Sequence, residues 1–197
     1  MARIYDNINE QFVKGLQNII SAQGVKWVDF CLGFFNLRGW KQVVNYIDTL
    51  PGDYVDEGQF GTDRRERYCR LLIGMHLTDK ELIRRMYGNS NPPDADYVQQ
   101  CKLQIAREFR EQLQIGMPTA EDEWILRRLA NQLRKGRVSV KLSTKEPLHA
   151  KLYLAYRPED HFNQILALMG SSNLTYAGLT KQGELDAPKF CFFKNYD

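Results

Sequence analysis

Four polar side chains near the C-terminus are of the types that bind and cleave a phosphate ester. His149 and Lys151 are separated by one residue in an alternating segment, 148–156. Ser171 and Asn173 are separated by one residue in Gly-Ser-Ser-Asn, which follows an apolar run. Residues two apart on a strand project from one face, roughly 6–7 Å from each other. An imidazole can attack phosphorus, while an ammonium, a hydroxyl and a carboxamide can bind its oxygens. The spacing predicts a phosphate site on two neighbouring strands.

A carboxylate further along the chain could orient the imidazole. Glu184 follows Asn173 by eleven positions, in Gln-Gly-Glu-Leu-Asp. A carboxylate that accepts from one ring nitrogen fixes the tautomer and leaves the other nitrogen free to attack. The candidate catalytic residues are therefore His149, Lys151, Asn173 and Glu184. The candidate substrate-binding residues are Lys151, Ser171 and Asn173.

These motifs together resemble those of the phospholipase D superfamily. H-x-K, G-S-x-N and the downstream Glu match it over residues 148–185. The strand expected over 25–35, followed by Arg-Gly-Trp and later by Arg-Leu-Leu-Ile-Gly-Met, also resembles the phospholipase D-like domain at the N-terminus of some bacterial helicases. The chain is similar, more loosely, to the single-motif nucleases of restriction systems.

The resemblance implies a dimeric site and a phosphohistidine intermediate. One His149 would attack phosphorus, while the His149 of a second copy would protonate the leaving oxygen and then activate water. Lys151, Asn173 and Ser171 would hold the phosphate. Because the chain has a single H-x-K motif, a complete site needs a second copy, which a C2 homodimer supplies. We expect no cofactor and no metal, since the sequence has no acidic metal-binding cluster.

The sequence departs from the family at one position. The family often has an aspartate five residues after the lysine, whereas this chain has Tyr156 there. The resemblance implies that this aspartate lies away from the phosphate and supports structure. The departure therefore concerns the subfamily, and it leaves open a degenerate, non-catalytic copy.

Composition indicates an ordinary soluble globular protein. The 197 residues are 43% hydrophobic and 26% charged, which suits a single domain over 1–197. The net charge of +3 is compatible with a phosphate-bearing partner but does not argue for one. Thirteen residues follow Glu184, fewer than such domains normally have, so we expect a fragment of a longer protein or a chain whose other functional parts lie elsewhere.

The spacing of the four cysteines argues against a protein with a zinc or redox thiol site, and the short apolar runs argue against a membrane-spanning protein. No C-x-x-C pair occurs, which argues against a zinc site or a redox dithiol. Cys31 and Cys69 lie in apolar runs and are expected in the core. Free thiols without a signal peptide favour the reducing cytoplasm. No run of about 18 apolar residues exists, so no membrane span is expected.

Hydrophobic periodicity gives the order of elements. The expected helices are 7–22 (with Asn7 or Asn9 as cap), 37–50, 78–87, 94–115, 119–135 and 176–179. The expected strands are 25–35, 68–75, 137–142, 148–156, 165–169 and at most one after 187, with a loop at 52–67. In the strand 148–156, the residues expected on the same face as His149 are Lys151 and Tyr153. This order predicts an α/β protein with a mixed, mainly β, sheet flanked by helices, phospholipase D-like, with a helical insertion around 78–135.

Several other residues are expected to be structural. Ser172 alternates away from Ser171, and Thr175 is expected to cap the short helix that follows it. His76 and His161 are expected to be ordinary loop residues. Trp27 and Trp40 are expected in the core, with the dimer interface as the alternative for at least one aromatic. The basic clusters are expected to be solvated faces, with a phosphate-contact surface as the alternative: Arg64, Arg65, Arg67, Arg127, Arg128, Arg134, Lys135 and Arg137.

Taken together, the sequence predicts a cytoplasmic, metal-independent phosphodiesterase or nuclease that acts on DNA in a restriction or other defence setting. A helicase or a restriction-system protein is the expected partner. DNA is preferred to lipid because no amphipathic membrane-docking segment is evident. The main alternative is a non-catalytic DNA-binding or dimerisation module, and a phospholipid phosphodiesterase ranks below both.

Overall fold

The computed structural model describes residues 5–8, 10–56, 64–74, 95–96, 99–100, 103–104, 107, 111, 119–143, 148–181 and 186–191. The elements in chain order are α1 (Phe12–Ile20), β1 (Trp27–Leu32), α2 (Leu37–Lys41), α3 (Val44–Thr49), β2 (Asp53–Asp56), β3 (Arg64–Arg67), β4 (Cys69–Ile73), α6 (Ala120–Arg134), β5 (Val138–Leu142), β6 (Lys151–Tyr156), β7 (Ile165–Gly170), α7 (Tyr176–Thr180) and β8 (Asp186–Cys191).

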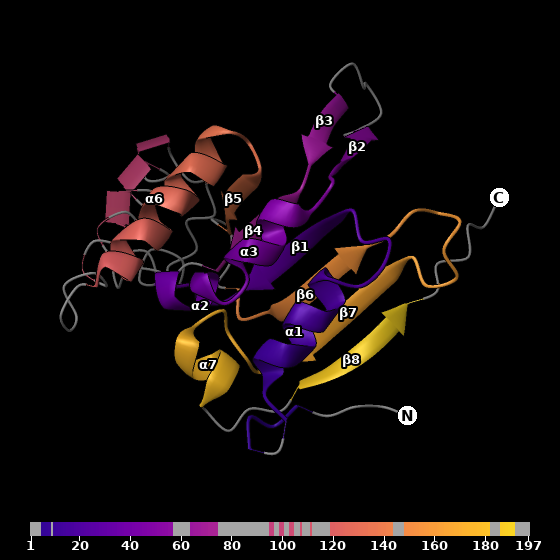
Figure 1. Cartoon of the computed structure of the whole chain (residues 1–197). Coiled ribbons are helices and arrows are strands. Elements are labelled where there is room, and N and C mark those ends of the chain that lie inside the picture. The colour runs from indigo at the N-terminus through magenta and orange to yellow at the C-terminus, as the bar shows by residue number, and fades with distance from the viewer. Residues whose placement is uncertain are drawn as a thin grey trace, which may run out of the picture.

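Six of these strands form one mixed sheet in the order β5-β4-β1-β6-β7-β8 (Figure 1). β1 pairs in parallel with β4, and β4 in parallel with β5. β6, β7 and β8 continue the sheet in antiparallel pairs on the other side of β1. This confirms the predicted mixed sheet flanked by helices. Because β6 is antiparallel to β1, the first residue of β6 lies next to the last residue of β1.

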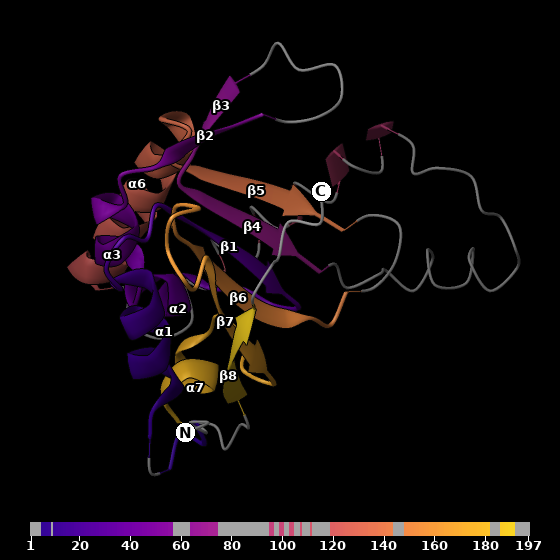
Figure 2. The ribbon, with the colours of Figure 1, turned by 90° about the vertical axis from the view of Figure 1, so that its right-hand side faces the viewer.

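One face of the sheet packs against the helices α1, α2, α3, α6 and α7 (Figure 2). Directly paired residues share a face, so the register separates two sets of side chains. The set that faces these helices includes the buried Val28, Phe30, Leu32, Leu71, Tyr153 and Leu168. Burying each such side chain contributes about 1.5–3 kcal/mol. The opposite set, which we call the far face, is Trp27, Asp29, Cys31, Arg70, Leu72, Ser139, Lys141, Leu152, Leu154 and Tyr156.

Two side chains that were expected in the core lie on the far face instead. Cys31 is half-buried there, whereas Cys69 is fully buried. Trp27 stacks on Tyr156 with ring centroids 4.8 Å apart, while Trp40 is fully buried as predicted. Strand period explains the difference, because neighbouring residues in an apolar run point to opposite faces of the sheet.

The segment 52–67, expected as a loop, contains the hairpin strands β2 and β3. Its register sets Asp53 opposite Arg67 and Asp56 opposite Arg64. Opposite charges at paired positions favour an antiparallel pair. The sequence hid these strands because charged residues replace the usual alternation of apolar and polar residues.

The helix predicted over 37–50 is two helices, because Val43 leaves the helical conformation with φ −121°. The apolar side that the periodicity identified is nevertheless buried throughout: Trp40, Val43, Val44 and Ile47.

The end signals predicted for the helix 119–135 are confirmed, whereas the helix predicted over 7–22 is the shorter α1, whose N-cap is Gln11 without a side-chain hydrogen bond. The Thr119 hydroxyl accepts from the Asp122 N–H at 3.1 Å, within a capping box. Gly136, with φ +71°, follows the end of α6. The predicted helix 78–87 and Asn9 lie outside the described residues, and those described within 94–115 are helical. The Asn7 side chain accepts from the N–H of Phe12, where α1 begins. No helix in the described part of the chain is long and apolar enough to cross a membrane.

Candidate functional site

Lys151 and Asn173 come together at the end of β1. A Cβ on Gly33 would lie 3.4 Å from the Asn173 Oδ1 and 3.5 Å from the Lys151 Nζ. Gly33 directly follows β1, and Lys151 is the first residue of β6, paired with Leu32. The ammonium and the carboxamide that were expected to bind a phosphate therefore lie beside the same glycine.

Asn173 is held in one orientation by the backbone. Its Oδ1 accepts from the N–H of Phe34 at 3.0 Å. The segment around it runs alongside the end of β1, where Phe35 and Leu174 form a parallel bridge and the Asn36 N–H donates to Leu174 O. Because the carbonyl arm of the Asn173 carboxamide is engaged, its NH₂ arm is the one available to a ligand.

Ser172 connects this segment to the strand β6. It is fully buried, and its carbonyl accepts from the Tyr153 hydroxyl at 2.9 Å. Tyr153 belongs to β6, the strand that begins with Lys151, so one strand carries the lysine and fixes the loop of the asparagine. Ser172 is thus structural, as predicted, while Ser171 is exposed. Thr175 caps α7 as predicted, accepting from the Gly178 N–H.

His149 precedes the strand on which it was expected. β6 begins at Lys151, so strand alternation does not set the direction of the His149 ring. Tyr153 was expected on the same face as His149, but the register places it on the side of the sheet that is buried under the helices. His149 and Lys151 do not meet through a shared strand face. The Lys151 Nζ instead donates a hydrogen bond to the His149 carbonyl oxygen at 3.0 Å. His149 itself is exposed.

The chain before His149 crosses two glycines. A Cβ on Gly74, just after β4, would overlap the Leu148 carbonyl oxygen and lie 3.3 Å from the Cα of Gly33. The Leu148 oxygen would also lie 3.5 Å from a Cβ on Gly33. The ends of β1 and β4 therefore let the His149 segment pass close to the sheet.

Glu184 lies outside the described residues, so its predicted hydrogen bond to the imidazole stays a prediction. His76 also lies outside them. His161 lies between the two motifs in the sequence but packs against Gly24, where a Cβ would overlap its ring. This packing accounts for His161 as an ordinary structural residue.

Tyr156, which stands where the family often has aspartate, belongs to a network on the far face. Burial first, and then the charge and hydrogen bond of Asp29, raise the pKa of Tyr156 to about 12, while the charges of Arg70 and Arg67 act in the opposite direction. Asp29 also accepts two hydrogen bonds from Arg70, at 2.7 and 2.5 Å. A carboxylate is therefore present next to this position, supplied by β1 instead of β6.

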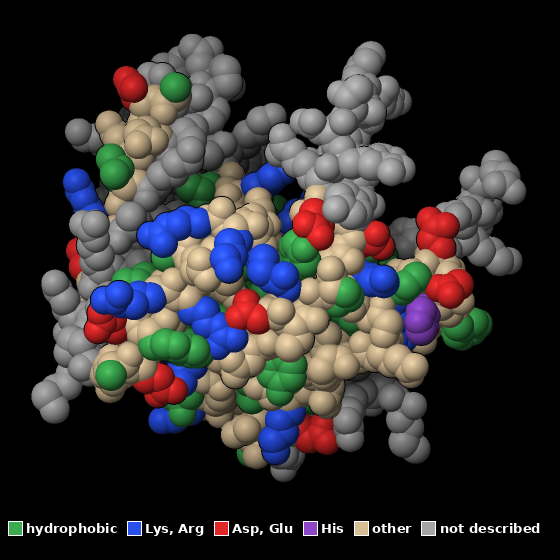
Figure 3. Space-filling model, turned by 45° about the horizontal axis from the view of Figure 1, so that its top comes forward, with side chains coloured by type: hydrophobic (Ala, Val, Ile, Leu, Met, Phe, Trp, Pro, Cys, Tyr) green, Lys and Arg blue, Asp and Glu red, His purple; other side chains and the backbone are tan. Residues whose placement is uncertain are grey.

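Much of the basic cluster around α6 is structural. Arg128 donates to Asp48 at 2.6 Å, and Arg127 to Glu123 at 2.6 Å. Arg137 donates to the carbonyls of Asp48 and Leu50 near the end of α3. Figure 3 accordingly shows Lys and Arg side chains gathered beside acidic ones. These pairings favour the structural interpretation for these three arginines.

Sequence reasoning missed the residues that position the site. Gly33, Phe34, Gly74 and Tyr153 contact the motif side chains or their backbone. The available signal was a glycine directly after each of two apolar strands, Leu-Gly at 32–33 and Ile-Gly at 73–74. Such a glycine often marks the close approach of another segment.

The arrangement can bind an anion next to the backbone of His149. Lys151 supplies a positive charge, Asn173 a donor amide, and Ser171 an exposed hydroxyl on the same loop. Fixed donors of this kind stabilise charge that develops on phosphate oxygens. Among the described residues, no group of three or more His, Cys, Asp or Glu could hold a metal ion.

Neither a family model nor a curated protein matches the sequence. Among solved structures, NucT from Helicobacter pylori matches with a TM-score of 0.42 and 10% identity, covering 95% of this chain and 84% of that one. A polyphosphate kinase from Porphyromonas gingivalis matches with a TM-score of 0.49 and 9% identity, covering 96% of this chain and 23% of that one. This chain thus spans about a quarter of the length of that kinase. Both are similar to this chain in chain path only.

Proposed function

We propose that this chain is a metal-independent phosphodiesterase of the phospholipase D type that cleaves DNA. The observation that carries the proposal is the convergence of the Lys151 ammonium and the Asn173 carboxamide beside Gly33, next to the backbone of His149. Residues that are 22 positions apart in the sequence meet there without any described metal-binding cluster. The H-x-K and G-S-x-N motifs support the same chemistry.

In the proposed reaction, a ring nitrogen of one His149 attacks phosphorus and the bond to the leaving oxygen breaks. The partner's His149 donates a proton to that oxygen, so the leaving group departs as a hydroxyl. The partner's imidazole then takes a proton from water, and the hydroxide attacks phosphorus and breaks the P–N bond. Both imidazoles return to their starting states. Lys151, Asn173 and Ser171 hold the non-bridging oxygens, and Glu184 orients the attacking ring.

DNA is the proposed substrate because the motif arrangement resembles that of helicase-linked and restriction-type domains. A cytoplasmic defence role with a helicase or restriction partner follows from the same resemblance. In the described part of the chain, the site lies at the ends of the central strands β1 and β6 and not on an apolar surface helix, which supports a polar polymer over a bilayer.

Cleavage in excess EDTA tests the proposal. We expect the wild-type protein to nick plasmid DNA and to release p-nitrophenolate from bis(p-nitrophenyl) phosphate without divalent metal, because its charge stabilisation comes from Lys151 and Asn173. Acid-labile phosphate on a histidine of the protein, measured by mass spectrometry after quenching in base, is the expected intermediate. Cleavage that appears only when Mg²⁺ or Mn²⁺ is added would contradict the proposal.

The specific observation in favour of the second candidate, a non-catalytic DNA-binding or dimerisation module, is Tyr156 at the family's aspartate position. DNA that is bound but stays intact with and without metal would support the module. A phospholipid phosphodiesterase would instead release choline from phosphatidylcholine vesicles, which we do not expect.

The dimer is tested with a heterodimer of wild-type and His149→Ala chains, isolated through two different affinity tags. If the two imidazoles serve one reaction, this heterodimer should cleave no faster than the His149→Ala homodimer, because either the nucleophile or the proton donor is missing. Half of the wild-type rate would show that each chain works alone. A wild-type homodimer carrying the same two tags is the control.

A further inference from the structure

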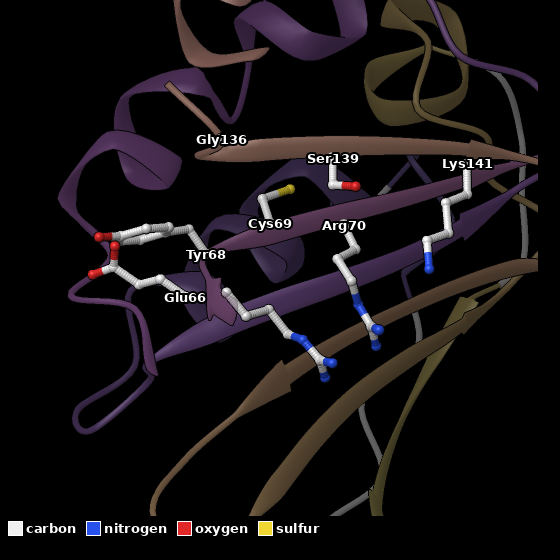
Figure 4. Close-up of a pocket in the computed structure, with 8 residues that line it drawn as sticks. Glu66, Tyr68, Cys69, Arg70, Gly136, Ser139 and Lys141 are labelled. Carbon is white, nitrogen blue, oxygen red and sulfur yellow. The ribbon is translucent and has the colours of Figure 1, made fainter. Parts of the chain in front are cut away.

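Basic side chains lie on the far face of the sheet, over β4 and β5. Arg70, Ser139 and Lys141 line an open hollow, together with Arg67. Figure 4 shows the head groups of Arg70 and Lys141 extending over the sheet in similar directions, whereas the Glu66 carboxylate points elsewhere. We call Arg67, Arg70 and Lys141 the basic row.

The basic row extends over several strands. The register sets Arg70 level with Asp29 and Ser139, and Lys141 level with Leu72. The charge of Arg67 acts to lower the pKa of Tyr156, which belongs to β6. Arg70 and the level of Leu72 are about 7 Å apart along β4, and Arg67 lies before this strand at the end of β3, so the row is long enough to contact more than one phosphate of a nucleic-acid strand.

One cation of the row is held rigidly. Asp29, whose side chain is only 14% exposed, binds the Arg70 guanidinium through two hydrogen bonds, and that guanidinium is 33% exposed. The carboxylate is thus more deeply buried than the cation that it holds. A guanidinium fixed before binding loses less conformational entropy when it contacts a phosphate.

An apolar floor lies next to the basic row. A second hollow shares Arg70 and Lys141 with the first, and Cys31, Leu72 and Leu154 line it. The Leu72 side chain is 37% exposed. A duplex offers mainly its phosphates to a sheet surface, whereas a single strand also offers base faces, which need an apolar surface.

We infer that the far face is a docking surface for single-stranded DNA, with phosphates on the basic row and bases on Leu72 and Leu154. That the strand is DNA rests on the proposed function. Lys141 pairs with Leu72, which lies two residues before Gly74. The row therefore ends about 7 Å along β4 from Gly74, the residue over which Leu148 passes. A strand lying on the far face therefore runs toward His149.

The test measures binding of a fluorescein-labelled oligothymidylate of 20 nucleotides by anisotropy at several salt concentrations. All chains carry His149→Ala, so that no cleavage interferes. The row variant is Arg67→Gln with Lys141→Gln. The control is Lys14→Gln with Arg127→Gln, which removes the same charge from exposed positions on the helices α1 and α6.

We expect the row variant to bind about tenfold more weakly, with a salt slope lower by about 1.4, since each single-strand phosphate contact contributes about 0.7. The control variant should change affinity less than about twofold. Leu72→Asp, which places a carboxylate among the bases, should weaken oligothymidylate binding by about tenfold and leave a 20-base-pair duplex unaffected.

Equal salt slopes for the row variant and the control would overturn the inference. So would a duplex, or an oligouridylate, that binds more tightly than oligothymidylate with the same sensitivity to the row. The two proposals fail separately: with His149 restored, the row variant should hydrolyse bis(p-nitrophenyl) phosphate at the wild-type rate. If the wild type does not hydrolyse it, the proposed function fails while the binding results still decide the docking surface.

Discussion

Alanine in place of His149 is expected to lower kcat/KM for bis(p-nitrophenyl) phosphate and for plasmid DNA by on the order of 10⁴-fold. A dimer of the variant lacks both imidazoles, so it lacks the nucleophile as well as the group that protonates the leaving oxygen and then activates water. Stability should not change, because His149 is exposed and precedes β6, so its removal leaves no cavity. Steady-state kinetics in EDTA and a thermal melt measure the two effects.

Two controls identify the cause of this loss. His161→Ala removes the other described histidine, which packs on Gly24, and should leave kcat/KM within about twofold of the wild type. Imidazole added to His149→Ala should partly restore cleavage, because a free ring can enter the space that the side chain leaves. A His149→Ala protein that retains more than a tenth of the wild-type rate would contradict the proposed nucleophile.

Gly74→Ala is expected to lower kcat by about 10²-fold while changing KM far less. Its Cβ would overlap the Leu148 carbonyl oxygen, which belongs to the backbone and can give way only by moving His149. A displacement of about 1 Å at a reacting group costs on the order of 10²-fold in rate. Overpacking should also destabilise the protein by about 1–3 kcal/mol. Separate kcat and KM values and urea unfolding measure these effects.

The matched control is Gly33→Ala, which directly follows the neighbouring strand β1. Its Cβ would lie 3.4–3.5 Å from the nearest atoms, which is ordinary contact. We therefore expect kcat to stay within a few-fold of the wild type and the free energy of unfolding to stay unchanged. Gly74→Ala with wild-type kcat and stability would show that the path of Leu148 does not position the imidazole.

The sequence predicted the site through the types of its residues and missed how they meet. Lys151 and Asn173 were expected to face the same way from adjacent strands, and β6 and β7 are indeed adjacent. Yet Asn173 follows the end of β7 and is fixed by Phe34 of the segment after β1. Sequence periodicity describes faces within one strand, and it does not show which strand ends share an edge.

The same limit explains the other differences. Cys31 and Trp27 lie in an apolar run whose alternate residues point to the far face, and one chain alone does not reveal which face the helices cover. The hairpin of β2 and β3 has no apolar alternation, so only the paired register shows its opposed charges. The helix ends at Thr119 and Gly136 were predictable because capping depends on local backbone groups.

The hydrogen bond between the Phe34 N–H and Asn173 joins residues 139 positions apart. In the proposed enzyme, a chain still emerging from the ribosome holds the end of β1 long before it holds the carboxamide. Closing so long a loop costs entropy that only the completed sheet offsets. The phosphate site therefore does not exist in chains that end before Asn173. A growing polypeptide of this kind would leave nearby nucleic acid intact until Asn173 has been made and the sheet has folded.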